Sequence, residues 1–227
     1  MAQTAQGRAA SGDGNKSFQL TKASSCDIIL LLMSRFELKM EKFLGAREGE
    51  LNEAMLFGFI NTSDPKYKLA EKGYQKDPND KAETPYIDHE RSMRLVREFQ
   101  PSSLDDPGTE FLKELRIEVG SRLGLDTAEE MEWLAVFTAI GRPRKTSMDL
   151  WHGVDGFISY KKPGLPEIVI TLDASWSQEK DPSKMKADIL IKGGDVPEPA
   201  DDDKFLEAVE KFADKIVKLI NKRIDHL

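Results

Sequence analysis

Three short runs with β-strand character in the last third of the chain carry carboxylates at or near their ends, whereas most of the remaining sequence has helical periodicity. These runs are residues 151–158 with Asp155, residues 168–173 with Asp173, and residues 186–191 with Asp188. Neighbouring strands hold such side chains at one edge of a sheet, and clustered carboxylates are ligands that a hard divalent cation prefers. The pattern therefore predicts a mixed α/β (α+β) protein with a candidate metal site at a sheet edge.

The first two runs are spaced like the strands of an antiparallel hairpin. The segment 161–164, Lys-Lys-Pro-Gly, has the composition of the connecting turn. Side chains alternate between the two faces of a strand, which places Asp155 with Phe157 on one face of the first strand and Asp173 with Thr171 on one face of the second. If the strands pair, the start of the first faces the end of the second. The hairpin then brings Asp155 and Asp173 together.

Apolar side chains at helical spacing predict most of the other elements. They predict helices over residues 24–44, 48–60, 86–99, 109–123, 127–141 and 201–224. Thr109 and Thr127 stand where helix N-caps belong, and Thr127 with Glu130 three positions later is a capping-box pattern. The chain is therefore expected to have a flexible tail over 1–17, a helical subdomain over 18–105 and an α/β core over 106–227.

Composition restricts the class of protein. The formal net charge of −7 argues against coating of nucleic acid by bulk electrostatics, although it leaves room for a local basic patch. A single cysteine, Cys26, excludes an internal disulfide framework and a multi-cysteine zinc site, so a reducing compartment is expected. The apolar run 28–33 is much shorter than the roughly 20 residues of a membrane span. We therefore expect a soluble, cytoplasmic protein with no membrane contact.

The carboxylate pattern resembles the PD-(D/E)XK nuclease superfamily. In that family a helix carries a Glu, a strand carries an Asp, and the hairpin partner strand ends in an acidic residue, one further residue and a Lys. The resemblance covers roughly residues 126–192 and implies a restriction-endonuclease-like small sheet flanked by helices. It also implies that Asp155, Asp173 and a helix acid, Glu130 or Glu132, bind Mg²⁺ or Mn²⁺ and that the protein hydrolyses phosphodiester bonds of DNA.

The chain departs from the family pattern at the lysine, because Ser175 occupies the position two residues after Asp173. Lys186, at the start of the third run, is the best substitute, and Lys180 and Lys161 are weaker ones. Without a lysine the site would bind metal but hydrolyse slowly or not at all. The alternative function is thus a catalytically inactive nuclease-fold subunit or assembly protein in a nucleic-acid-processing or defence complex. Its N-terminal helices would bind a protein partner or a second copy.

Basic and aromatic residues near the runs are candidate nucleic-acid contacts. Arg142, Arg144 and Lys145 precede the first run and are expected to bind phosphates. Trp176 follows Asp173 closely and either stacks on a base or covers the core. The closing helix presents a basic face, which is either a solvated charge stripe or a track for DNA; its members are Lys211, Lys215, Lys218 and Lys222.

Structural roles also fit the candidate site residues. Aspartates at strand ends often cap turns, and Asp155 lies close to Gly153 and Gly156, so a turn role or a satisfied buried hydrogen bond is an alternative to metal binding. His152 could act as an acid, a base or a ligand, or serve only in packing. If the carboxylates do not converge, a scaffold without a site remains.

Overall fold

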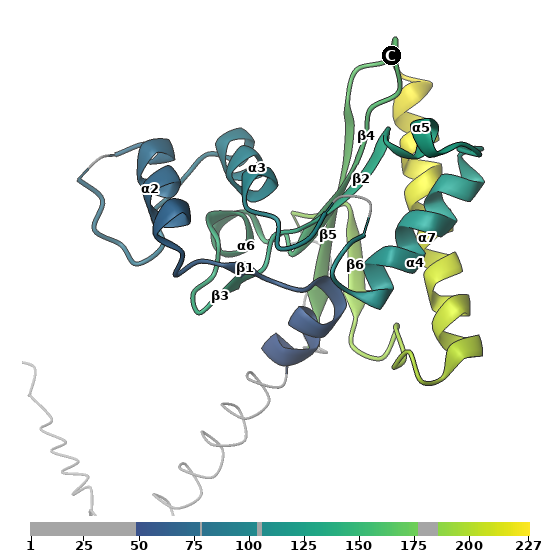
Figure 1. The fold of residues 1–227 in the computed structure, drawn as a ribbon, viewed down its shortest axis with the longest axis horizontal. Helices are drawn as coiled ribbons and strands as arrows, with labels where there is room; N and C mark the ends of the chain where they lie inside the picture. Colours follow the sequence, from purple (N-terminus) through teal and green to yellow (C-terminus); the bar gives the residue numbers. More distant parts are fainter. Residues whose placement is uncertain (1–48, 78, 104–105, 177–185) are drawn as a thin grey trace, which may run out of the picture. The chain divides into compact units, whose positions relative to one another are not determined.

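The computed structural model describes residues 49–77, 79–103, 106–176 and 186–227, which belong to one compact unit spanning Gly45–Leu227. The predicted tail, the predicted helix over 24–44, Cys26 and Lys180 lie outside the described residues. The described part is a mixed α/β structure, as the sequence predicts (Figure 1). Within these ranges no helix is long and apolar enough to cross a membrane.

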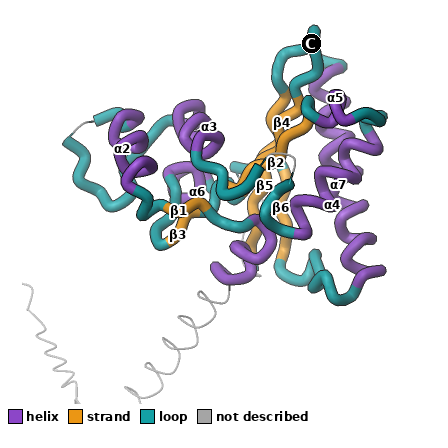
Figure 2. Tube along the Cα trace, viewed as in Figure 1, coloured by secondary structure: helices purple, strands orange, loops and turns teal. Residues whose placement is uncertain are grey.

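Within the described residues, the elements up to residue 131 are mostly helices, and most of the strands lie between residues 134 and 192 (Figure 2). Residues 49–57 are helical. The elements that follow are β1 Ile60–Asn61, α2 Pro65–Tyr74, α3 His89–Glu98, α4 Glu110–Arg122, α5 Ala128–Met131, β2 Leu134–Thr138, β3 Gly141–Arg142, α6 Ser147–His152, β4 Gly156–Tyr160, β5 Ile168–Ser175, β6 Ile189–Lys192 and α7 Asp202–Ile224.

The main sheet has four strands in the order β2-β4-β5-β6. β4 pairs antiparallel with both β2 and β5, whereas β5 and β6 are parallel. The β4–β5 hairpin turns at Pro163-Gly164, where Gly164 has a φ of +86°, as the sequence pattern predicts. A separate two-stranded sheet pairs β1 with β3 in parallel, with Ile60 opposite Gly141.

Apolar side chains cover both faces of the main sheet. Alternate residues such as Ile158, Ile170 and Leu172 share a buried cluster with apolar residues of α4 and α7, which lie side by side against the sheet (Figure 1). The intervening residue Phe157 joins a second cluster with residues of α3 and α6, among them Leu95. Because side chains alternate along a strand, Asp155 and Asp173 share the face of Phe157, away from α4 and α7.

The predicted helix over 127–141 is wrong beyond its first turn. The capping box of Thr127 and Glu130 is present, but α5 ends at Met131 and the chain then forms strand β2. The spacing of the apolar residues in this stretch is compatible with a helix or with a strand, and Val136 and Phe137 both have good strand propensity. Pairing with β4 decides between the two, because it buries Val136 on one face and Phe137 on the other.

Other element boundaries in the structure also differ from those predicted from the sequence. Trp151 and His152 end helix α6 instead of starting a strand, and Gly153 closes that helix with a φ of +61°. The predicted helix over 48–60 ends at residue 57, and Ile60 lies in β1. The predicted helices that correspond to α3, α4 and α7 are confirmed, and Thr109 caps α4 by accepting from the N–H of Leu112.

The segments before and after residue 105 contribute to the same buried cluster and to the same two-stranded sheet. Ile60 and Leu95 belong to the same buried cluster as Phe157, and β1 pairs with β3 across position 105, where the sequence predicts a division between domains. The helical region before α4 therefore forms part of the surroundings of the strand ends that carry the carboxylates.

Candidate carboxylate site at the β4–β5 edge

Asp155 and Asp173 lie opposite each other at one end of the β4–β5 hairpin. The ladder pairs Gly156 with Leu172, and the N–H of Asp155 donates to the carbonyl of Leu172 over 2.9 Å, which extends the register to Asp155 and Asp173. Both aspartates are 4% exposed. One carboxylate oxygen of Asp155 accepts from the N–H of Ala174 at 2.8 Å. The structure thus brings the two predicted carboxylates together on one face.

Helix α6 adds a third buried carboxylate, and the segment before it adds a cation. Asp149 is 7% exposed, and Thr146 caps the helix by accepting from the N–H of Asp149. The Nζ atom of Lys145 lies 2.8 Å from Oδ1 of Asp149. Because Gly153 adopts the left-handed conformation, the chain reverses after α6 and enters β4 within a few residues. This connection places Asp149 beside Asp155.

The cluster contains more buried carboxylates than cations, and this excess affects their pKa values. Burial raises the pKa of Asp155 to about 8, and the carboxylates of Asp149, Glu53 and Asp173 add to the shift, whereas the N–H of Ala174 opposes it. Burial also raises the pKa of Asp149, against the effect of Lys145. Burial lowers the pKa of Lys145, but the Asp149 carboxylate outweighs it and the net pKa is raised, so Lys145 is a cation.

A cavity of about 580 Å³ leads to the cluster. Glu50 and Glu53 of the helical residues 49–57 line it, together with Arg142 of β3 and with Lys145 and Asp149 of the α6 end. Lys145, Asp149 and Glu53 all interact electrostatically with Asp155, which indicates that the cavity wall is near the buried pair, although neither Asp155 nor Asp173 lines the cavity itself. Sequence reasoning missed Glu53 and Asp149. No local pattern connects Glu53 to the hairpin, which lies more than 100 positions further along the chain, although Asp149 could have been found as an acid on a capped turn beside the first run.

The predicted helix acids do not reach the aspartates. The carboxylate of Glu130 accepts from Thr127 in the capping box of α5, and these hydrogen bonds lower its pKa. Helix α5 leads into Leu134, which pairs with Tyr160 at the end of β4 opposite to Asp155. Glu132 is exposed at the end of the same helix. Glu53, from the helical residues 49–57, is the helix acid that interacts electrostatically with Asp155.

Lys186 and Asp188 stabilise the structure around β6. The Nζ atom of Lys186 donates to the carbonyl of Trp151 at 2.7 Å, which ties the start of this segment to the end of α6. Asp188 accepts from both the N–H and the hydroxyl of Thr171 and forms an ion pair with Arg223. The carboxylate of the third run therefore holds β6 against β5 and α7.

The predicted phosphate-binding residues have divergent surroundings. Arg144 forms an ion pair with Glu71, and both side chains are largely buried. The guanidinium of Arg142 lies over the ring of Phe59, 5.7 Å from its centroid, and donates to the carbonyl of Glu50 at 2.7 Å. Of the three predicted contacts, Arg142 and Lys145 line the cavity, whereas Arg144 does not.

Trp176 and the basic face of α7 lie in other surroundings. Trp176 is half-buried and packs against the main core. It lies so close to Gly193 that a larger residue at position 193 would collide with it. That arrangement matches the alternative in which Trp176 covers the core. The four lysines of the predicted basic face of α7 are exposed, namely Lys211, Lys215, Lys218 and Lys222. Helix α7 packs on the sheet face opposite to Asp155, so this basic face and the carboxylate cluster belong to different sides of the sheet.

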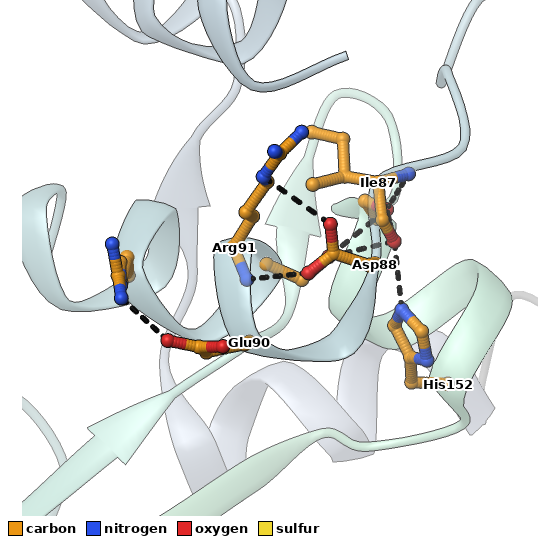
Figure 3. A network of polar contacts seen from close by, with 8 residues as sticks. Ile87, Asp88, Glu90, Arg91 and His152 are labelled. Atoms are coloured by element: carbon orange, nitrogen blue, oxygen red, sulfur yellow. Dashed lines mark hydrogen bonds and ion pairs between the residues drawn. The ribbon is translucent and has the colours of Figure 1, made fainter. Parts of the chain in front are cut away.

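His152 joins the ends of two helices. Asp88 caps α3 by accepting from the N–H of Arg91, and Nε2 of His152 lies 2.9 Å from the carbonyl oxygen of Ile87. Both contacts are drawn in Figure 3. The ring of His89 lies edge-on to that of His152, with centroids 5.2 Å apart. Burial lowers the pKa of His89, and His152 lowers it further. This arrangement matches the packing role for His152.

The described residues contain no ready-made metal-binding group, and comparisons with known proteins found no relative. Within the described residues, no group of three or more His, Cys, Asp or Glu side chains is arranged to hold a metal ion. No protein-family model, curated protein or solved structure matches the chain. The functional argument therefore depends on the geometry and the electrostatics of the cluster itself.

Proposed function

We propose that this protein is a metal-dependent, nuclease-like enzyme that hydrolyses phosphodiester bonds of DNA at the Asp155–Asp173 pair. The observation that carries the proposal is that two buried carboxylates face each other on paired strands beside an open cavity. The resemblance to the PD-(D/E)XK superfamily supports it, because that family holds its two acids on such a hairpin. We include in the proposal a restriction-endonuclease-like fold, favoured by a small sheet with helices on both faces.

The donor set fits Mg²⁺. This ion commonly takes one or two protein carboxylates and completes its octahedron with water and substrate phosphate, so a dedicated cage of three protein ligands is not needed. Asp155 and Asp173 would hold the ion, with Glu53 at the cavity wall in the place expected for Glu130. When bound, a divalent ion polarises a phosphoryl oxygen and lowers the pKa of bound water. Buried negative charge from several carboxylates also favours a cation here.

Lys145 is the residue that we propose in place of the lysine that Ser175 replaces. Its Nζ atom is held by Asp149 at the cavity wall, and it stays protonated because that carboxylate outweighs its burial. A fixed cation there stabilises the charge that develops on a phosphate during attack by water. Arg142, on the same cavity, supplies planar N–H donors suited to phosphate. Lys186 instead holds the end of α6.

The test combines metal binding with cleavage. Mg²⁺ and Mn²⁺ are titrated calorimetrically into the wild type and into an Asp155→Ala/Asp173→Ala variant, and both proteins are incubated with plasmid and single-stranded DNA. We expect the double variant to lose binding and cleavage. Glu130→Gln is the matched control, because it removes an acid at the far end of the sheet and should leave both unchanged. Loss of cleavage in Lys145→Ala but not in Lys186→Ala would assign the lysine.

The second candidate is a catalytically inactive nuclease-fold subunit of a nucleic-acid-processing or defence complex. It is favoured by Ser175, which is 7% exposed and leaves the usual lysine position without a cation. Metal binding without cleavage of any DNA would support this candidate over the enzyme. If the wild type neither binds metal nor cleaves DNA, the carboxylates are structural and both proposals are wrong.

A further inference from the structure

We propose that the 580 Å³ cavity binds one nucleotide of a single DNA strand, with its base stacked on Phe59, so that the substrate is single-stranded. This inference rests on the proposed function and names its substrate class. It depends on the size of the cavity, on an aromatic side chain exposed beside charged groups, and on the burial of the carboxylates.

The walls of the cavity come from three separate elements. The parallel β1–β3 pair supplies one wall: Ile60 is 1% exposed, whereas Phe59, Asn61 and Arg142 line the cavity. The helical residues 49–57 contribute Glu50 and Glu53, and the start of α6 contributes Lys145 and Asp149. The volume lies in the range of small-ligand pockets, which span about 300–1,000 Å³. This recess is therefore large enough to hold a small ligand such as one nucleotide.

Phe59 is the feature that favours a base. Its side chain lies on the cavity but remains 46% exposed, and the guanidinium of Arg142 lies over its ring. An aromatic ring exposed among charged groups offers a stacking surface for any base, because every base has a π face. Arg142 contributes through its charge and its own planar group. Phe59 and Arg142 together form a platform of the kind that binds single-stranded nucleic acid.

Burial of the acids favours a single strand over a duplex. Asp155 and Asp173 are each 4% exposed, so a phosphate must enter the recess to approach them. A nucleotide in an intact duplex must first leave its base stack to enter such a recess, whereas a nucleotide of a single strand does not pay that penalty. Two cations and three carboxylates line the recess, so a divalent cation would favour binding of a phosphate there by offsetting the negative charge.

The experiment measures DNA binding in the presence of Ca²⁺. This hard divalent cation replaces Mg²⁺ so that binding is measured without cleavage of the DNA. Fluorescein-labelled oligonucleotides of one sequence, single-stranded and blunt duplex, are titrated with the wild type, Phe59→Leu and Tyr86→Leu, and binding is followed by anisotropy. Tyr86 is the matched control, since it is an aromatic residue with a similar exposure of 43% and does not line the cavity. Circular dichroism checks that each variant is folded.

We expect the wild type to bind the single strand at least tenfold more tightly than the duplex. Phe59→Leu should weaken binding of the single strand about tenfold, as the loss of one stacked base predicts, while Tyr86→Leu should have little effect. Equal binding of both DNAs, with no effect of Phe59→Leu, would overturn the inference. So would the absence of DNA binding in a protein that binds metal, whereas absence of metal binding would instead overturn the proposed function.

Discussion

Asp155 is buried and lies near other carboxylates, and both conditions disfavour its charged form. In an unfolded chain an aspartate ionises near pH 3.9, whereas burial and the neighbouring carboxylates raise the pKa of Asp155 to about 8 in the folded protein. Between these two values the folded protein retains a proton that the unfolded chain has lost. The residue therefore makes folding depend on pH in a defined direction.

The first prediction concerns this pH dependence in metal-free buffer. The free energy of unfolding should fall as pH rises from about 4 to about 8 and should level off above that range, because the folded state binds more protons there. Asp155→Asn keeps the shape and removes the charge, so it should flatten the curve and stabilise the protein by a few kcal/mol at high pH. Urea denaturation at a series of pH values measures both curves. Parallel curves for the two proteins would contradict the assignment.

Arg144 shows that a basic residue near the site can serve folding instead of binding. Removing one member of its buried pair with Glu71 leaves an uncompensated charge, so Arg144→Leu should cost about 3 kcal/mol of unfolding free energy. Arg144→Leu/Glu71→Leu should recover most of that loss. The exposed pair of Arg94 and Glu90 is the control, and Arg94→Leu should cost less than about 1 kcal/mol. Denaturation of all three variants tests this prediction.

At the scale of elements, Gln100 stabilises strand β2 from the side away from β4. Its side-chain oxygen accepts from the N–H of Thr138, and its amide donates to the carbonyl of the same residue, both at 3.0 Å. These two hydrogen bonds take the place of those that a neighbouring strand would make at this edge of the sheet. This tertiary contact is one reason why residues 134–138 form a strand although their apolar spacing also suits a helix.

Gln100→Ala should therefore destabilise the protein by about 1–3 kcal/mol, since it leaves two backbone groups of Thr138 without this partner. Hydrogen exchange at the N–H of Thr138 should accelerate more than exchange at the central residue of β4, Ile158. An unchanged exchange rate at Thr138 would show that the contact does not protect the edge. Gln75→Ala, beyond the end of α2, serves as the control on a glutamine outside the sheet.

At the scale of the whole molecule, binding of a divalent cation should couple to stability. A ligand that binds only the folded state adds about 2.7 kcal/mol when its concentration is 100 times Kd. We expect Mg²⁺ to raise Tm by several degrees at pH 8 and by less at pH 6, because the protons on the carboxylate cluster must leave before the ion binds. Addition of EDTA should reverse the rise, which differential scanning calorimetry can follow.

The control for this prediction is Asp155→Ala/Asp173→Ala, in which the metal-dependent rise in Tm should disappear. Glu130→Gln should retain it, because Glu130 caps α5 at the other end of the sheet. An equal rise in wild type and double variant would place the ion elsewhere on the molecule and would contradict the proposed site.

Features that depend on neighbours in the chain could be predicted from the sequence alone. The N-cap of α4 at Thr109, the capping box at Thr127 and the hairpin that places Asp155 opposite Asp173 all follow from spacing over fewer than 20 residues. Such patterns are readable because a capping side chain and a two-residue alternation act over short distances along the chain.

Features that depend on distant contacts were decided only by the tertiary structure. Strand pairing with β4 turned residues 134–138 into β2, and the approach of the helical residues 49–57 brought Glu53, rather than Glu130, to the aspartates. The same packing buried Arg144 against Glu71 and left Arg142 on the cavity. No local propensity encodes these outcomes, because each arises from the free energy of burying side chains that are separated by dozens of residues.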